Sequence, residues 1–333
     1  MNIRYSRQLL YSNIGQSGQD QLAEKTVLIV GVGALGSLSS EMLTRAGVKK
    51  LILIDRDFVE LTNLQRQTLY TELDAKDKVP KAIAAKERLE QINSQVELEV
   101  HVAHADGHLL ESLAEKADLI LDGTDNFETR MLINDVAYKI GKPWIYAACV
   151  EASYSSAAFI PGETPCFRCL TPLLPTSSLT CDTAGIISPA VHMAVSHQVT
   201  TALKILTGQL GAPYYLHIGN IWDHDHMKAD ISKMTEASCP TCQLKEFPEL
   251  NRLEADAMRF CGRDMIQVIN QRLTETVVKE TLEQAHIAYK QTPYFIEFNY
   301  NDSRIISFSN GRMLMHNVVS LNKARTIVNQ LFG

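Results

Sequence analysis

The sequence predicts an α/β fold in which a doubly wound mixed sheet carries helices on both faces, followed by a small C-terminal α+β domain. Short apolar runs rich in β-branched residues alternate with helix-compatible stretches in the first half of the chain, the order that builds a parallel sheet. A polar, acidic stretch around residues 245–256 resembles a linker. Beyond it, alternating strand patterns with turn signals predict a separate, smaller architecture.

The first elements form a strand–turn–helix–strand unit. Residues 27–30 predict a buried strand, residues 34–46 a helix closed by Gly47, and residues 51–54 the next strand. We expect the alternation to continue with a helix at 81–92, strands at 96–103, 119–121, 144–160 and 214–221, and a long helix at 188–207. Residues 161–187, rich in Pro, Thr and Ser, are expected to form a surface loop.

The C-terminal stretch predicts a small domain of its own. Its expected elements are a strand at 267–269, a helix at 276–288, alternating strands joined at Asn301-Asp302 and Asn310-Gly311, and a final helix at 321–331. The Asn-Gly step is the strongest of these signals, because it suits the turn of a tight hairpin. We therefore expect two domains, residues 1–249 and residues 250–333.

Composition and charge exclude several classes of protein. The chain has 333 residues, 45% of them hydrophobic and 21% charged, so it can bury a sizeable core and is not globally disordered. Its 32 basic and 38 acidic residues give a net charge of −6, which argues against a nonspecific nucleic-acid or membrane binder. Seven cysteines are too few for a disulfide scaffold of this length, and the N-terminus does not resemble a signal peptide. We expect a cytoplasmic protein whose cysteines are thiols or metal ligands.

A glycine-rich motif follows the first strand and opens the first helix. Gly31, Gly33 and Gly36 form a GxGxxG pattern, whose backbone can approach a phosphate closely while the helix N-terminal amides face the anion. Asp55 ends the next strand, where its carboxylate can accept hydrogen bonds from ribose hydroxyls. Taken alone, this Rossmann-like combination favours NAD, and the alternative without a ligand is a tight strand–helix turn.

The residues that follow Asp55 favour a triphosphate over a dinucleotide. Arg66 can form bidentate hydrogen bonds to phosphate oxygens, and Asn63 can add a neutral donor. Lys81 starts a helix, where its charge and the helix N-terminus act on the same anion. The alternative for Arg66 and Lys81 is a solvated charged face, the usual place of such residues. The set expected around the nucleotide is completed by Asp57, Gln65 and Asn126.

Asp125 is the candidate for positioning Mg²⁺. It lies in the polar turn 122–126, at the carboxyl end of a predicted strand, the edge where open α/β sheets bind ligands. Mg²⁺ prefers oxygen ligands and substrate phosphates. The structural alternative is an N-cap for the helix that begins near Phe127, a role that suits Asn126 or Thr124 better than Asp125.

Two CxxC pairs supply four thiols. Cys166 and Cys169 form the first pair, and Cys239 and Cys242 form the second. Four thiolates in two close pairs are typical of a tetrahedral structural zinc site, provided that the fold unites the pairs. Two redox dithiols are the competing interpretation.

Two smaller features have open alternatives. Cys181 lies in a predicted loop and is a candidate nucleophile, although lone cysteines are more often inert. His224 and His226 have the residue type of metal ligands, but we expect them in a solvated turn.

Together these motifs resemble the MoeB/ThiF/HesA family, whose members are bacterial relatives of the ubiquitin-activating enzymes. The resemblance covers about residues 3–245 and rests on the order of its motifs rather than on GxGxxG alone. Those motifs are Arg4-Tyr-Ser-Arg7-Gln8, Gly31–Gly36, Asp55-Arg-Asp57, Asn63–Gln67, Pro80-Lys81, Thr124–Asn126, both CxxC pairs and residues 180–189. The C-terminal extension resembles a tail found in some Gram-positive-type members, and we expect no rhodanese-like domain.

The resemblance implies an ATP-dependent adenylyltransferase. Its substrate would be a ubiquitin-like sulfur-carrier protein of the MoaD or ThiS type, whose C-terminal Gly-Gly carboxylate attacks the α-phosphate of Mg-ATP. The products are an acyl-adenylate and pyrophosphate, and cations are needed because negative charge develops on the phosphates. A separate sulfur-donor protein would then supply the sulfur for a thiocarboxylate, in molybdopterin or thiamin-thiazole biosynthesis.

The resemblance also assigns roles to single residues. Arg7 resembles an arginine finger that reaches across a dimer interface into the partner's site, which implies a homodimer. Cys181 corresponds to a loop cysteine that forms a covalent link to the carrier in some members only. The four paired cysteines would bind one structural zinc per chain. The residues that would hold the nucleotide are Asp55 for the ribose, Asn63, Arg66 and Lys81 for the triphosphate, and Asp125 for Mg²⁺.

Two other functions compete with adenylation. An NAD-dependent oxidoreductase would leave Arg66 and both CxxC pairs unexplained. A non-catalytic scaffold that binds a carrier protein would have no need for the charges of Arg7, Lys81 and Asp125. The sequence does not choose between the molybdopterin and thiazole carriers, and a related role in tRNA thiolation is also open.

Overall fold

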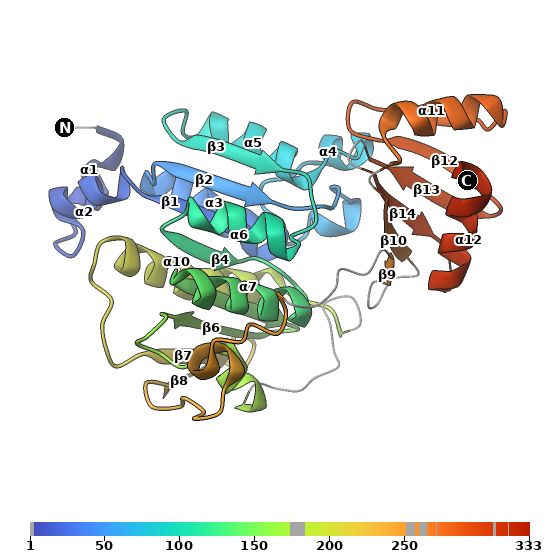
Figure 1. Cartoon of the computed structure of the whole chain (residues 1–333). Helices are drawn as coiled ribbons and strands as arrows, with labels where there is room; N and C mark the ends of the chain where they lie inside the picture. The colour runs from blue at the N-terminus through green and yellow to red at the C-terminus, as the bar shows by residue number, and fades with distance from the viewer. Residues whose placement is uncertain are drawn as a thin grey trace. The chain divides into compact units, whose positions relative to one another are not determined.

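Residues 3–173, 184–250, 257–259, 265–270, 272–308, 311–318 and 320–333 are described by the computed structural model of the chain. The chain divides into two units, Met1–Arg252 and Leu253–Gly333 (Figure 1). Among the residues described, no helix has the length and apolar character needed to cross a membrane.

The first unit is built on an eight-stranded sheet with the order β3-β2-β1-β4-β5-β6-β7-β8. The pairs from β3 to β5 are parallel and those from β5 to β8 antiparallel, so the predicted mixed, doubly wound sheet is confirmed. The chain order reverses between β1 and β4, which makes their carboxyl ends a topological switch point. The strands are β1 (Thr26–Val30), β2 (Lys50–Ile54), β3 (Glu97–His101), β4 (Leu119–Asp122), β5 (Trp144–Val150), β6 (Ser153–Phe159), β7 (Tyr215–Asn220) and β8 (Asp225–Asp230).

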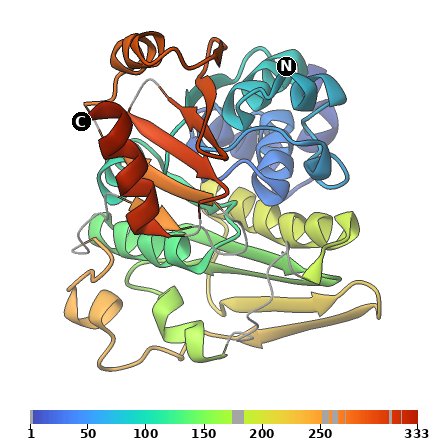
Figure 2. The same ribbon diagram turned by 90° about the vertical axis from the view of Figure 1, so that its right-hand side faces the viewer.

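Helices cover both faces of this sheet (Figure 1, Figure 2). On one face lie α3 (Ala34–Ala46), α5 (Lys81–Ile92) and α10 (Ser188–Leu206), and on the other α6 (Gly107–Glu115) and α7 (Phe127–Ile140). Successive strand residues point to opposite faces, so Ile29 belongs to the first core and Leu28 to the second. Because both faces are covered, the central strands are continuous apolar runs rather than alternating patterns.

Local sequence signals set the ends of these helices, and the remaining helices of the first unit are short. At the C-terminus of α3, Gly47 adopts a left-handed φ of 82°, as its position in the sequence predicts. At the N-terminus of α7, Asn126 Oδ1 accepts a hydrogen bond from the Thr129 N–H at 2.8 Å, so the N-cap interpretation of Asn126 is confirmed. The short helices are η1 (Ile3–Tyr5), α1 (Ser6–Leu9), α2 (Gly15–Leu22), η2 (Leu61–Asn63), α4 (Glu72–Asp77), α8 (Phe167–Leu170), η3 (Thr171–Leu173) and η4 (Pro240–Leu244).

The segments 144–160 and 161–187 differ from the sequence-based expectation. The strand expected at 144–160 is an antiparallel hairpin of β5 and β6, whose turn at Glu151 adopts a left-handed φ of 54° without a glycine. The surface loop expected at 161–187 contains α8 and η3. Phe167 in this segment is 1% exposed, because its side chain belongs to the apolar core on one face of the sheet.

The solvated turn expected for His224 and His226 contains only the first of them. His224 lies between β7 and β8 with a left-handed φ of 57°. His226 lies on β8 and meets two further histidines. β8 is an edge strand of the sheet and is exposed over most of its length, so its sequence is polar. The polar composition of this stretch therefore did not indicate a strand.

The second unit is a six-stranded antiparallel sheet with the order β11-β12-β13-β14-β10-β9. Its core is apolar and includes side chains from both helices and most strands. Asn301 and Asp302 form the predicted turn between β12 and β13 with φ values of 46° and 61°. Of the second predicted turn, Gly311 has a φ of 79° and Asn310 lies outside the described residues. The elements are β9 (Ala257–Arg259), β10 (Met265–Ile269), α11 (Glu275–Gln284), β11 (Tyr289–Gln291), β12 (Ile296–Tyr300), β13 (Ser303–Ser307), β14 (Arg312–His316) and α12 (Leu321–Phe332).

Candidate functional site

A glycine-rich loop joins β1 to α3 and lies against the loop that follows β4. A Cβ atom at Gly31 would lie 2.8 Å from the carbonyl oxygen of Gly123, and one at Gly36 would lie 1.8 Å from that of Gly31. Among the residues that the structure describes, a Cβ atom at Gly33 would meet only the amide nitrogen of Gln67, at 3.9 Å. Packing within the chain therefore requires glycine at positions 31 and 36, whereas Gly33 borders open space at the helix N-terminus.

Asp55, directly after β2, holds this loop in place. Its Oδ2 accepts a hydrogen bond from the Val32 N–H and its Oδ1 one from the Asp57 N–H, each at 2.7 Å. Burial raises the pKa of Asp55, and the charge of Lys81 opposes that rise. The carboxylate thus has a structural task that the sequence does not indicate, and each oxygen retains a lone pair for a ligand hydroxyl.

Lys81 is buried in the first turn of α5. Only 6% of the residue is exposed, and its Nζ lies 3.6 Å from Asp57 Oδ2. Its backbone N–H donates to the Asp57 carbonyl at 2.9 Å, which ties the start of α5 to the segment after β2. The solvated-face interpretation is therefore wrong for Lys81. A buried ammonium at a helix N-terminus is well placed to bind an anion.

Tyr70 connects the glycine loop to α5, a role that the sequence analysis missed. Its hydroxyl donates to the Val32 carbonyl at 2.6 Å and lies 3.3 Å from the Lys81 carbonyl. Burial, with the carboxylates nearby, raises the pKa of Tyr70, so the hydroxyl stays a donor. No local signal could reveal this contact, because the partners are separated by 38 and 11 residues.

Two buried amides follow in the segment that contains η2. Asn63 is 3% exposed, and its Oδ1 accepts a hydrogen bond from the Glu60 N–H at 3.1 Å, which stabilises η2. Gln67 is 4% exposed, and its Oε1 has no hydrogen-bond partner in the described part of the chain. A buried polar atom without a partner is destabilising unless a ligand or water satisfies it. Since the amide of Gln67 is also the group nearest to Gly33, Gln67 joins the candidate site.

Arg66 and Gln65 are more accessible than these amides. Arg66 is half-buried, and its Nη1 donates to the Thr62 carbonyl at 3.0 Å. Gln65 is exposed, and its Nε2 donates to the Ile186 carbonyl at 3.4 Å. The structure therefore gives both side chains contacts within the chain, and it places neither among the buried residues around Lys81.

The loop after β4 is fixed by a buried ion pair. Asp122 is fully buried, and its Oδ2 accepts a hydrogen bond from Arg130 Nε at 2.9 Å. Its Oδ1 accepts one from the Thr124 N–H at 2.9 Å, which shapes the turn. Asp125, two residues from Gly123, is exposed at the end of this rigid turn. Arg130 was not among the predicted residues, since its partner lies on another element.

Arg7 lies at the far end of α3 from the glycine loop. Its helix, α1, is held there by Gln8, whose Nε2 donates to the Ala46 carbonyl at 3.0 Å. α3 has 13 residues and begins after Gly33, so its two ends are about 20 Å apart. Arg7 is exposed and does not join Lys81 within one chain. Cys181, the candidate nucleophile, lies outside the described residues.

The fold unites the two CxxC pairs, with all four Sγ atoms within 4.8 Å of one another. Cys166 and Cys239 are 3.5 Å apart at Sγ, as are Cys169 and Cys242, whereas Cys166 and Cys169 are 3.8 Å apart. Cys166 and Cys169 thus each lie nearer to a thiol of the other pair than to one another. This arrangement favours one four-thiol site over two separate redox dithiols.

The neighbourhood of the four thiols suits a cation. Burial raises the pKa of the Cys169 thiol to about 11, so the thiolate of Cys169 is favoured when a positive ion compensates its charge. Arg168, between the first two cysteines, pairs with Asp135 at 3.5 Å and with Glu249 at 3.4 Å. Thr241, between the other two, donates to Asp135 at 2.6 Å. Asp135 on α7 therefore holds both halves of the site together.

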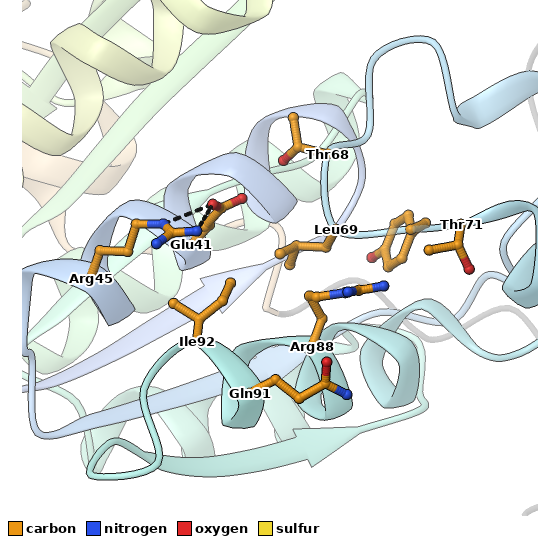
Figure 3. Close-up of a pocket in the computed structure, with 9 residues that line it drawn as sticks. Glu41, Arg45, Thr68, Leu69, Thr71, Arg88, Gln91 and Ile92 are labelled. Atoms are coloured by element: carbon orange, nitrogen blue, oxygen red, sulfur yellow. Dashed lines mark hydrogen bonds and ion pairs between the residues drawn. The ribbon is translucent and has the colours of Figure 1, made fainter.

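A cavity of about 550 Å³ lies between α3, α5 and the segment before α4 (Figure 3). Tyr70, which contacts the glycine loop, is one of the residues that line the cavity. None of the predicted site residues that the structure describes lines it. Figure 3 shows Arg45 paired with Glu41, at 2.7 Å, on its α3 wall. The other lining residues are Thr68, Leu69, Thr71, Arg88, Gln91 and Ile92.

Comparison with known proteins gives consistent similarities. The model of the ThiF family matches residues 5–244. The chain is 41% identical to the sulfur carrier protein ThiS adenylyltransferase of Bacillus subtilis over 337 aligned residues, which cover 100% of both chains. It is 35% identical to the molybdopterin-synthase adenylyltransferase of Escherichia coli, over 73% of this chain and 95% of that one. A crystal structure of E. coli MccB with ATP is similar in fold, with a TM-score of 0.64 and 24% identity over 73% of this chain and 75% of that one.

Proposed function

The chain belongs to the ThiF family, and from this premise we propose that it is an ATP-dependent adenylyltransferase of a ubiquitin-like sulfur-carrier protein. The observation that carries the proposal is the buried Lys81, which lies beside two aspartates at the carboxyl edge of the sheet. In the reaction, a carboxylate oxygen of the carrier forms a bond to the α-phosphorus of ATP. The bond from that phosphorus to the bridging oxygen breaks, and pyrophosphate leaves with its electron pair.

The residues around the glycine loop would bind the nucleotide. The space beside Gly33 admits a phosphate, the loop amides and Lys81 would neutralise its charge, and Asp55 would accept hydrogen bonds from the ribose. Asn63 and Arg66 would extend the triphosphate contacts. Bringing an anionic carboxylate to an anionic phosphate is unfavourable in the absence of such cations, so we assign Lys81 the largest share of the charge compensation.

Asp125 is the proposed residue for Mg²⁺. Its exposed carboxylate follows the rigid turn fixed by Asp122 and Arg130, so its position is defined while its oxygens remain accessible. Mg²⁺ would supply Lewis-acid stabilisation of the phosphates, and carboxylate oxygens are ligands that suit it. Asn126 would contribute mainly by capping α7 and thereby keeping Asp125 in place.

We also propose a homodimer with composite sites. Arg7 lies near the end of α3 that is remote from the glycine loop, and the two ends of this helix are about 20 Å apart, which favours a role for Arg7 in the active site of a second copy. The resemblance of the N-terminal segment to an arginine finger agrees with this placement.

The four paired cysteines are proposed to bind one structural Zn²⁺. Four sulfur donors within 4.8 Å suit a tetrahedral zinc site, and the metal would join α8 to η4. A cytoplasmic location is part of the proposal, because a reducing compartment keeps such thiols available.

Among carriers, we propose the ThiS type. The similarity to the Bacillus subtilis ThiS adenylyltransferase covers the whole chain, including the second unit, whereas that to the molybdopterin-synthase adenylyltransferase covers 73% of it. Sulfur would come from a separate donor protein, and Cys181 is a candidate for a covalent link to the carrier. The oxidoreductase alternative has no support among the relatives described above.

Carrier-dependent exchange of pyrophosphate into ATP tests this proposal. The purified chain is mixed with labelled pyrophosphate, ATP, Mg²⁺ and either a ThiS-type or a MoaD-type carrier that ends in Gly-Gly. We expect exchange with the ThiS-type carrier and none with a carrier that lacks the final glycine. Exchange with the MoaD-type carrier alone would overturn the choice of carrier, and no exchange with either would overturn adenylation.

A further inference from the structure

Three histidines from three different elements meet on the same side of the sheet. His197 lies on α10, His217 on β7 and His226 on β8, elements that Figure 1 labels. One nitrogen from each ring lies within 4.8 Å of the others. The ring centroids are 4.4 Å apart for His197 and His217, and 5.1 Å apart for His197 and His226.

The rings are nearly parallel, whereas a metal ion lies close to the plane of each imidazole that it binds, so binding requires the rings to turn toward one point. The planes of His197 and His226 differ by 2°, and those of His197 and His217 by 18°. In a zinc site with three imidazoles, the nitrogens are roughly 3.4 Å apart when each metal–nitrogen bond is about 2.1 Å. Rotation about the side-chain bonds of the three residues would turn the rings and bring the nitrogens, now within 4.8 Å of one another, to that spacing.

Two hydrogen-bonding details are those of a prepared ligand set. The Nδ1 atom of His217 is buried and has no hydrogen-bond partner in the described part of the chain. A buried nitrogen without a partner is destabilising, and coordination of a metal would satisfy it. The Tyr154 hydroxyl lies 3.1 Å from His226 Nδ1, which fixes that ring and leaves Nε2 as its ligand atom.

We propose that His197, His217 and His226 form a second metal site, which binds one divalent transition-metal ion. Imidazole nitrogen suits Zn²⁺, Co²⁺, Ni²⁺ and Cu²⁺. His226 is exposed, so the site is open to solvent and retains a coordination position for water. Bound metal would join the long helix α10 to the edge hairpin of β7 and β8.

This site is separate from the four-cysteine cluster. Tyr154, stacked against His197, belongs to the core on the α10 side of the sheet. Cys166, Cys169 and Cys239 belong to the core on the opposite side. Lys204 and Lys228 act electrostatically on His217, and their positive charges oppose a cation. The three histidines would bind the metal ion through neutral nitrogen atoms and without negative charge. We therefore expect this site to bind metal more weakly than four thiolates do.

Cobalt binding to the untagged full-length chain tests the proposal. The protein is purified with its cysteine cluster loaded with zinc, and Co²⁺ is then titrated while visible absorbance is recorded. We expect one equivalent to bind with ligand-field bands and without sulfur-to-cobalt charge-transfer absorption. Absence of cobalt binding, or binding that shows only the sulfur bands, would overturn the proposal.

Four variants assign the binding to these rings. His226→Ala, at an exposed position, should raise the Kd for Co²⁺ at least about tenfold. Tyr154→Phe keeps the packed ring but removes the hydroxyl, and it should weaken binding by about tenfold. His192→Ala on α10 and His224→Ala in the β7–β8 turn are matched controls and should bind as the unchanged chain does. Equal losses in the controls, or none in His226→Ala, would overturn the assignment.

Discussion

The Nζ atom of Lys81 lies 3.6 Å from the Asp57 carboxylate, although only 6% of this lysine is exposed. An ammonium group is placed in such surroundings at a considerable desolvation cost, which an adjacent carboxylate offsets. The pair lies where α5 begins and next to the carboxylate that fixes the glycine loop. The arrangement combines structural support with the anion binding that we propose for Lys81.

Replacement of Lys81 by Met should reduce ATP–pyrophosphate exchange by at least about 100-fold, because charge on the phosphates is no longer neutralised. The matched control is Lys86→Met on the same helix, where a half-buried lysine pairs with Glu90 at 3.8 Å. That variant should retain full exchange. Exchange rates are compared after circular dichroism has established that both variants are folded, and undiminished exchange in Lys81→Met would refute the assignment.

The glycines of the loop should respond differently to the same substitution. Gly36→Ala places a Cβ atom 1.8 Å from a carbonyl oxygen, so it should lower the free energy of unfolding by more than about 2 kcal/mol. Gly33→Ala meets no atom of the described residues closer than 3.9 Å and should change that free energy by less than about 0.5 kcal/mol. It should nevertheless raise the KM for ATP, because the methyl group occupies space that a phosphate needs. Denaturant unfolding and exchange kinetics measure the two effects, and an unchanged KM would argue against a phosphate beside Gly33.

Replacement of Cys239 by Ser should remove bound zinc from the four-thiol site. We expect one zinc per chain fewer by elemental analysis, together with a lower Tm, because α8 and η4 lose their link. Cys149→Ala is the control, since Cys149 is a buried thiol on β5 outside the cluster. It should retain the zinc, and a serine variant with undiminished zinc content would contradict the site.

Local signals in the sequence predict much of this structure, and the misses share a physical cause. The strand before Gly31, the helix ending at Gly47 and the cap at Asn126 follow from short-range rules, because the residues that decide them are neighbours in the chain. Tyr70 and Arg130 were missed, since their partners lie on other elements. A spacing pattern carries no information about such contacts until the fold is known.

The same distinction applies to the proposed metal ligands. The two CxxC pairs could be recognised because the cysteines of each pair are close together in the sequence. Only the meeting of the two pairs in the fold had to be assumed. His197, His217 and His226 have no such local pairing, and only the packing of α10 on the edge hairpin brings them together. The hairpin at Glu151 was missed for a related reason, since a non-glycine residue at positive φ is held there by pairing of β5 with β6.

Heterodimers of two inactive variants should reveal whether Arg7 acts across the interface. The chains Arg7→Ala and Lys81→Met are co-expressed with different tags, and the doubly tagged dimer is isolated. If Arg7 serves the partner's site, one site combines Lys81 of the first chain with Arg7 of the second. Exchange should then return to about half of that of the unchanged dimer.

A reciprocal heterodimer supplies the control. Here an unchanged chain is paired with a chain that carries both substitutions. Lys81 of the unchanged chain then faces a partner without Arg7, so action of Arg7 across the interface predicts no exchange. Action within one chain predicts the opposite pattern, with activity in this dimer and none in the first. Because Arg7 lies at the end of α3 remote from the glycine loop, we expect activity only in the first.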